Sequence, residues 1–213
     1  MKTLRKIVAT ACVASVAAFG VAACGSDKGG GGGGGGEGGG GGGDITVNAT
    51  SFPDYIDPQL SYTLEGWEVL WNVYTPLLTY KHAKGKEGTQ VVPGLAEDMP
   101  EISPDGKIYK LKLRPNMKYS DGTPIKASDF TYGIQRLFKA ESGGSVFFDV
   151  IVGAQDYADG KADTISGIKT DDNTGDITIE LTEANGTFEN VLGLMFAAPV
   201  PPSTPLDLSL IHI

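Results

Sequence analysis

Histidine and cysteine, which often act as catalytic bases, nucleophiles or metal ligands, are few in this 213-residue chain, with two of each. Its two histidines are His82, which sits among lysines, and His212, near the C-terminus. An H-E-x-x-H zinc site needs two histidines on one helix face, and a serine or cysteine nucleophile needs a histidine beside it. Neither arrangement is present, so the sequence predicts no catalytic residue, no metal site and no cofactor.

One group of oxygen-bearing side chains is dense enough to suggest a cation site. It partly matches the spacing of a calcium-binding loop and consists of Asp171, Asp172, Asn173, Gly175 and Asp176. The glutamate that ends such a loop is missing, and residues 165–169 and 177–181 on either side have strand character. The group therefore favours a hairpin turn over a calcium site.

Cys24 is the cysteine whose surroundings point to chemistry. Three basic residues precede a mostly apolar run over residues 7–23, and Val21-Ala22-Ala23-Cys24 then resembles a lipobox, in which the cysteine is lipidated and the preceding segment is removed. A membrane-spanning helix is the alternative, since the run is nearly long enough to cross a bilayer. Its alanine-rich composition and the glycine-rich sequence that follows favour a lipoprotein signal peptide at residues 1–23 and an extracytoplasmic protein anchored to the membrane through Cys24.

Residues 29–43 are glycine throughout except for Glu37. Glycine has no side chain to bury and loses the most entropy on ordering, so we expect residues 24–43 to form an unfolded tether. The coil from residue 25 to residue 43 would span roughly 24 Å. A phosphate-binding loop is excluded because no Gly-Lys-Ser or Gly-Lys-Thr closes the tract. A tract expanded by replication slippage and merely tolerated is the alternative to a functional tether.

Residues 103–138 predict a strand and an amphipathic helix joined by tight turns. Asp105-Gly106 and Asp121-Gly122 favour turns, because glycine accepts a positive φ and aspartate bonds the adjacent backbone. Ser128 is the predicted N-cap of the helix. The apolar positions alternate along the strand and then recur at helical spacing, at Tyr109, Leu111 and Leu113 and afterwards at Phe130, Ile134, Leu137 and Phe138.

The other predicted elements complete an α/β chain without internal repeats. They are a first strand at residues 45–49, a helix at 65–74, a short helix at 154–158, hairpin strands at 165–169 and 177–181, and a last helix over 188–195. The helix at 65–74 places Trp67, Leu70, Trp71 and Tyr74 on one face, where aromatic residues favour a core position over a ligand-binding surface. The net charge of −9 and the lack of a basic cluster typical of nucleic-acid binding indicate no nucleic-acid partner.

Four motifs of the chain, taken in order, resemble those of one family. Residues 105–129 contain DGK-x-Y-x-x-x-LR and then DGTP-x-x-A-x-D, which closely resembles the signature of the dipeptide/oligopeptide/nickel group (family 5) of ABC-transporter solute-binding proteins. Ile56-Asp57-Pro58, Asn72–Leu77 and Val92–Glu97 resemble the LDP, NVYEPL and P-x-LAE motifs of that family. The resemblance extends from Ile45 to Pro205.

The resemblance implies an α/β, periplasmic-binding-protein-like (type II) fold, in which two lobes joined by a hinge enclose a ligand. Residues 44–207 would be the N-terminal part of this domain with its inserted subdomain. The implied partners are a peptide or similar small solute, with a nickel complex or a sugar left open, and an ABC permease/ATPase complex; we expect a monomer. A sensory or cell-wall-binding lipoprotein of the same fold and a lipid-anchored hydrolase are the alternatives.

The family places residues that line its ligand cleft after the LDP motif, which corresponds to residues 61–67 here. The candidate ligand-binding residues that the resemblance implies are Tyr62, Thr63, Leu64 and Glu65. Their alternative role is to form the approach and the first turn of the helix predicted at 65–74.

Residues 208–213 resemble the translation of a sequencing-library adapter, so we expect a non-native tail on an N-terminal fragment of a longer family member. We also expect a compact unit over residues 67–195. Residues 45–58 and those after 199 should lie outside it, because the first strand would lack the strands that pair with it.

Lipidation at Cys24 predicts that wild-type protein partitions into detergent and carries an acyl mass, because two acyl chains are enough for stable anchoring. Cys24→Ala should leave an unlipidated precursor that keeps residues 1–23. Detergent partitioning and mass spectrometry measure both properties. Wild-type protein with residues 1–23 intact and no acyl mass would contradict the prediction.

Overall fold

The computed structural model of the protein describes Thr46, Asn48 and residues 51–206, and the described residues from Asn48 onwards form one unit. The predicted signal peptide with Cys24, the tether and the tail at 208–213 lie outside the described residues. So does most of the strand predicted at 45–49, of which Thr46 and Asn48 are exposed and belong to no strand. No helix within the described residues is long and apolar enough to cross a membrane.

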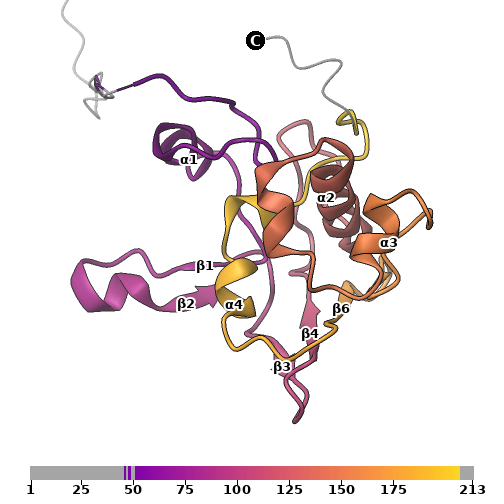
Figure 1. The fold of residues 1–213 in the computed structure, drawn as a ribbon. Helices are drawn as coiled ribbons and strands as arrows, with labels where there is room; N and C mark the ends of the chain where they lie inside the picture. The colour runs from indigo at the N-terminus through magenta and orange to yellow at the C-terminus, as the bar shows by residue number, and fades with distance from the viewer. Residues whose placement is uncertain (1–45, 47, 49–50, 207–213) are drawn as a thin grey trace, which may run out of the picture. The chain divides into compact units, whose positions relative to one another are not determined.

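Short helices and antiparallel strands make up the unit (Figure 1). In chain order the elements are α1 (Leu64–Leu70), β1 (Leu78–Tyr80), the 3-10 helix η1 (Gly85–Thr89), β2 (Val91–Pro93), β3 (Glu101–Ile102), β4 (Ile108–Lys112), α2 (Ala127–Lys139), η2 (Gly143–Phe147), α3 (Ala154–Ala158), β5 (Ile168–Asp171), β6 (Asp176–Glu180), α4 (Phe188–Val191) and η3 (Met195–Ala197). β1 and β2 pair as a hairpin, and the other strands form a four-stranded sheet in the order β3-β4-β6-β5.

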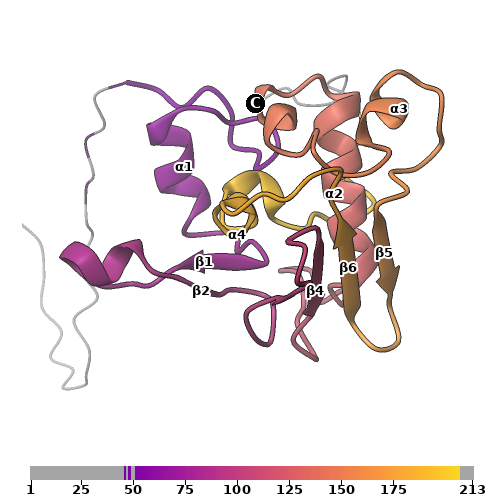
Figure 2. The same cartoon turned by 60° about the horizontal axis from the view of Figure 1, so that its bottom comes forward.

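The four-stranded sheet is antiparallel and carries the core on one face. Tyr109 lies opposite Ile179 and Leu111 opposite Ile177, and all four side chains are buried. Lys110, between them, is exposed, so the predicted strand and its alternation are confirmed. α2 packs against β5, and Figure 2 shows it lying along the sheet.

The predicted amphipathic helix is confirmed as α2, and the short helix predicted at 154–158 is confirmed as α3. The N-cap prediction for α2, Ser128, is wrong. The Asp129 carboxylate accepts the backbone N–H of Lys126 (2.9 Å), while Ser128 donates its N–H and its hydroxyl to Asp172 in the β5–β6 turn (2.8 and 2.9 Å). Two aspartates, one of them distant in sequence, therefore satisfy the free groups at this helix end.

The predicted hairpin is confirmed as β5 and β6. Its first arm starts three residues later than predicted, because the N–H of Ile168 bonds the carbonyl of Ile165 in a turn (3.1 Å). Asp171 accepts the N–H of Asn173 (2.8 Å), and Gly175 adopts a φ of 80°, so this group of residues builds the turn. Within the described part of the chain, no three His, Cys, Asp or Glu side chains come together in a way that could hold a metal ion.

The first and last helices are shorter than their apolar spacing predicts. α1 ends at Leu70. The N–H of its C-cap, Trp71, still bonds the carbonyl of Trp67, but those of Asn72 and Val73 bond carbonyls only three residues back. Trp71 lies beyond the helix and is 48% exposed, so its predicted core position is wrong. α4 likewise gives way after Val191 to turns and to η3.

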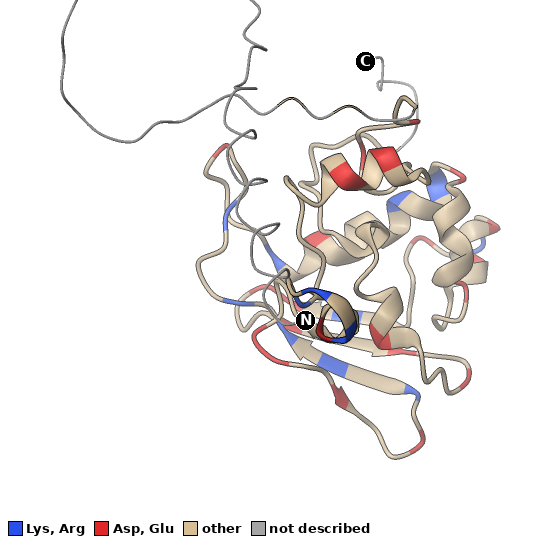
Figure 3. Cartoon of the chain, turned by 90° about the vertical axis from the view of Figure 1, so that its left-hand side faces the viewer, with Lys and Arg blue, Asp and Glu red and all other residues tan. Residues whose placement is uncertain are grey.

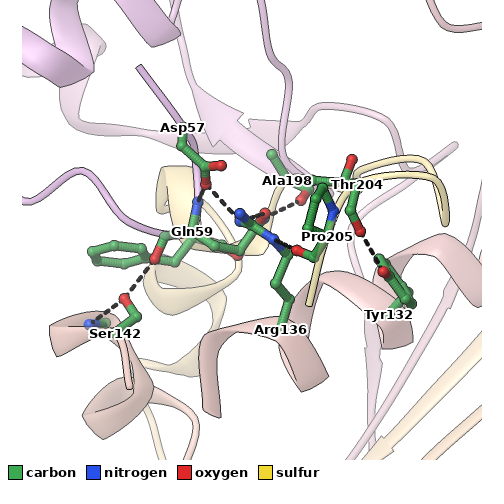
Figure 4. A network of polar contacts seen from close by, with 10 residues as sticks. Asp57, Gln59, Tyr132, Arg136, Ser142, Ala198, Thr204 and Pro205 are labelled. Atoms are coloured by element: carbon green, nitrogen blue, oxygen red, sulfur yellow. Dashed lines mark hydrogen bonds and ion pairs between the residues drawn. The ribbon is translucent and has the colours of Figure 1, made fainter. Parts of the chain in front are cut away.

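Arg136, in α2, is fully buried and joins segments that are far apart in the sequence (Figure 4). Its guanidinium donates to the Asp57 carboxylate (2.6 Å), to the side-chain carbonyl of Gln59 (3.2 Å) and to the backbone carbonyl of Pro205. Gln59 in turn donates to the carbonyl of Ala198 (2.8 Å). The compact unit predicted at 67–195 is therefore too narrow, because the segments 57–61 and 196–205 supply the acceptors that a buried guanidinium requires.

Asp57→Ala should destabilise the unit by about 3–5 kcal/mol, because it leaves the Arg136 guanidinium buried without its counter-charge. Urea unfolding followed by tryptophan fluorescence measures the loss. The control Asp159→Ala removes an exposed pair with Lys161 and should leave the unfolding midpoint nearly unchanged. If both substitutions lower the unfolding midpoint equally, the buried pair contributes no more to stability than the exposed pair does.

Candidate ligand-binding site

The four candidate residues lie where the chain enters α1. Thr63 is the N-cap, since its hydroxyl accepts the N–H of Gly66 (3.3 Å), and Leu64 and Glu65 form the first turn. The side chains of Tyr62 and Leu64 are 57% and 66% exposed. Tyr62, Thr63 and Leu64 line a cavity of about 160 Å³, whereas Glu65 is not among its lining residues.

Asp54 fixes the backbone that presents these residues. Its carboxylate accepts the N–H of Tyr62 (2.7 Å) and the hydroxyls of Ser61 (2.7 Å) and Thr63 (2.9 Å). Partial burial alone would raise the pKa of Asp54, but these bonds and a further one from the N–H of Tyr55 outweigh it and lower the pKa below its usual 3.8. Asp54 is therefore ionised at neutral pH and holds the segment in one conformation.

Aromatic rings from three parts of the chain form the lower wall of the cavity, the side opposite the exposed side chains of Tyr62 and Leu64. Phe196 is fully buried, and its ring centroid lies 5.7 Å from that of Tyr62, 5.3 Å from that of Trp67 and 6.1 Å from that of Phe147. These distances lie in the range over which aromatic pairs attract each other. Local sequence patterns do not reveal Phe147 and Phe196 as site residues, because their contacts join positions far apart in the chain.

Two adjacent glycines allow the rings to meet. A Cβ atom at Gly144 would lie 2.6 Å from the ring of Phe196, and one at Gly143 would lie 3.4 Å from the ring of Tyr62. Only a residue without a side chain permits such a close approach of backbone at Gly144. The Gly-Gly pair is thus the one sequence signal that could have indicated this contact.

The lining of the cavity is mostly apolar and aromatic and suits the binding of an apolar group. The cavity is lined by three further apolar or aromatic side chains beside Tyr62 and Leu64, together with the Thr63 hydroxyl that is already engaged by Asp54. Pockets that bind a whole small molecule usually have a volume of about 300 Å³ or more, so this smaller cavity fits one apolar side chain of a larger ligand. His82 is exposed and is not among the lining residues.

Asp54→Asn should lower the urea midpoint of unfolding at pH 7, because the amide accepts these hydrogen bonds less strongly than the carboxylate. The gap to wild type should shrink as the pH falls below 3.8. A lowered folded-state pKa contributes stability above the unfolded-state pKa, and this contribution is lost as the carboxylate protonates.

The same measurement on Asp149→Asn provides the control, since Asp149 is exposed and makes no hydrogen bond within the described residues. A gap between wild type and Asp54→Asn that stays constant from neutral pH to below 3.8 would contradict the role given to this carboxylate.

The chain is similar to several known proteins in sequence and in fold. The dipeptide-binding protein DppE of Bacillus subtilis is 30% identical over 138 residues, which are 63% of this chain and 24% of DppE. The structure of the pheromone receptor PrgZ superposes with a TM-score of 0.62 and 32% identity, over 69% of this chain and 28% of PrgZ. The substrate-binding domain of an oligopeptide ABC transporter from Bacillus anthracis superposes with a TM-score of 0.61 and 27% identity, over 68% of this chain and 27% of that domain.

The chain thus spans about a quarter of the length of these relatives, and the predicted α/β periplasmic-binding-protein-like fold is confirmed for that part. Residues 90–208 match the family described as "Bacterial extracellular solute-binding proteins, family 5 Middle". This match covers more than half of the chain and includes the strands of the sheet, α2 and the rings of Phe147 and Phe196. The chain belongs to family 5 of the bacterial extracellular solute-binding proteins.

Proposed function

We propose that the chain supplies one wall of the ligand cleft of an extracytoplasmic solute-binding protein that delivers peptides to an ABC importer. The observation that carries the proposal is the exposed segment Tyr62–Leu64, held by Asp54 above an aromatic cavity in a family 5 member. The names of relatives support it: DppE is a dipeptide-binding protein, PrgZ is a receptor with a described mode of peptide binding, and the Bacillus anthracis domain belongs to an oligopeptide ABC transporter.

The cavity would receive one apolar side chain of the ligand. Tyr62 and Leu64 would then lose their exposed apolar surface to the ligand, which contributes about 25 cal/mol per Å² buried. The other walls would come from the three quarters of the family domain that this chain does not span, and closure of the two lobes would enclose the ligand. The ligand is carried without chemical change, so the protein needs no nucleophile or general base.

The N-terminal sequence supports a location outside the cytoplasm. Lipid on Cys24 would hold the protein at the membrane, and the tether at 24–43 would let the binding unit move above it and meet the permease. A monomer suffices for this cycle, because each lobe of the cleft belongs to one chain.

Tyr62→Ala in the longer protein that carries this chain should weaken peptide binding about tenfold, the effect expected for an aromatic side chain buried at an interface. Calorimetric titration measures the Kd, and the melting temperature should change little because Tyr62 is largely exposed. Tyr55→Ala is the matched control, since Tyr55 is also exposed but does not line the cavity. An unchanged Kd together with a large drop in melting temperature would identify Tyr62 as a core residue.

A further inference from the structure

The hairpin tip, residues 81–90 between β1 and β2, projects from the rest of the unit (Figures 1 and 2). Its hydrogen bonds within the described residues all run to other residues of the tip. The N–H of Lys81 bonds the carbonyl of Gln90 (2.9 Å), the N–H of Gln90 bonds that of Glu87 (3.2 Å), and the Thr89 hydroxyl bonds that of Lys86 (2.9 Å). The tip is therefore a structured turn with one face free, and not a loop that packs on the core.

The tip is basic although the chain is acidic, with a net charge of −9. It carries Lys81, Lys84 and Lys86 and a single acid, Glu87, which pairs with Lys81 (2.9 Å). Lys84 and Lys86 are exposed and make no ion pair with any described residue. Figure 3, in which the left-hand side of Figure 1 faces the viewer, shows the blue of basic residues at this tip as well as on the strands.

The lysines of the sheet do not form a comparable patch. Lys110 and Lys112 share a groove with four acids, Glu97, Asp98, Glu101 and Asp176, and Lys112 lies 3.9 Å from Glu97. The acids therefore outnumber the lysines in this groove of the sheet, whereas the tip keeps an excess of positive charge. The tip also carries no large apolar side chain, so it suits a charged surface and not insertion into an apolar one.

We infer that the hairpin tip docks on the anionic phospholipid headgroups of the membrane to which the chain is tethered. The orientation of the protein on the membrane rests on the proposed lipid anchor at Cys24. The tether would keep the tip close to the membrane and raise its effective concentration there. Each lysine near an anionic bilayer contributes an attraction that falls off within a Debye length. Docking through the tip would limit the orientations in which the ligand cleft faces the permease.

The test uses the chain from residue 24 onwards with Cys24→Ala, which has neither signal peptide nor lipid and keeps the unit that begins at Val47 whole. Sedimentation with phosphatidylglycerol-containing vesicles should show binding that vesicles of phosphatidylcholine alone do not support. Lys84→Glu with Lys86→Glu should weaken this binding at least about tenfold. Raising the salt from about 0.1 M to about 1 M should abolish it.

The matched control is Lys110→Glu with Lys118→Glu, which makes the same change in charge at two exposed lysines outside the tip. It should weaken binding far less than the tip variant, and both variants should melt at the wild-type temperature. Equal losses from the two variants, or no preference for anionic vesicles, would overturn the inference. Because the test protein carries no lipid and no peptide is added, this result is independent of the anchor and of ligand binding.

Discussion

A guanidinium that is removed from water needs a counter-charge and hydrogen-bond acceptors, and Arg136 finds both in two distant segments, through its Nε and Nη1 atoms. Its Nη2 atom is buried and bonds no described residue. One segment precedes α1 and supplies Asp57 and Gln59, and the other follows η3 and supplies the carbonyl of Pro205. Tyr132, also in α2, donates its hydroxyl to the carbonyl of Thr204 in the second segment. The buried charge and its hydrogen bonds thus help to determine how both outer segments lie on the domain. Removing a charge from water costs free energy, a cost that apolar packing alone would not incur.

The candidate segment Tyr62–Leu64 is held by this network and, separately, by Asp54. Gln59 is tied to Arg136 and to the carbonyl of Ala198, two residues beyond Phe196, so the ring of Phe196 and the approach to Tyr62 are positioned by one network (Figure 4). On the other side, Asp54 holds the N–H of Tyr62. The exposed side chains at the cavity are therefore carried by a backbone whose hydrogen bonds are internal to the protein. Such preorganisation reduces the entropy lost on binding.

What could be predicted from the sequence was local. The alternation of Tyr109 and Leu111 with lysines, the apolar stripe of α2 and the Asp-Gly turns each depend on residues a few positions apart, and all of these elements are present. The bond from Ser128 to Asp172 and the contact of Phe196 with Tyr62 join residues that are 44 or more positions apart, which periodicity does not encode. Motif resemblance located the candidate segment, but it could not show that Glu65 lies outside the cavity lining.

Phe196 serves the stability of the protein and the shape of the cavity at once, since it is fully buried and still forms the cavity's lower wall. A smaller residue there would open a void in the core, so mutations that enlarge the cavity from below would be removed by selection in most backgrounds. Tyr62 and Leu64, on the opposite wall, are largely exposed, so their replacement opens no such void. Among proteins related to this one, we therefore expect changes in ligand preference mainly through substitutions at Tyr62 and Leu64, which are nearly neutral for folding. Phe196 should change more slowly.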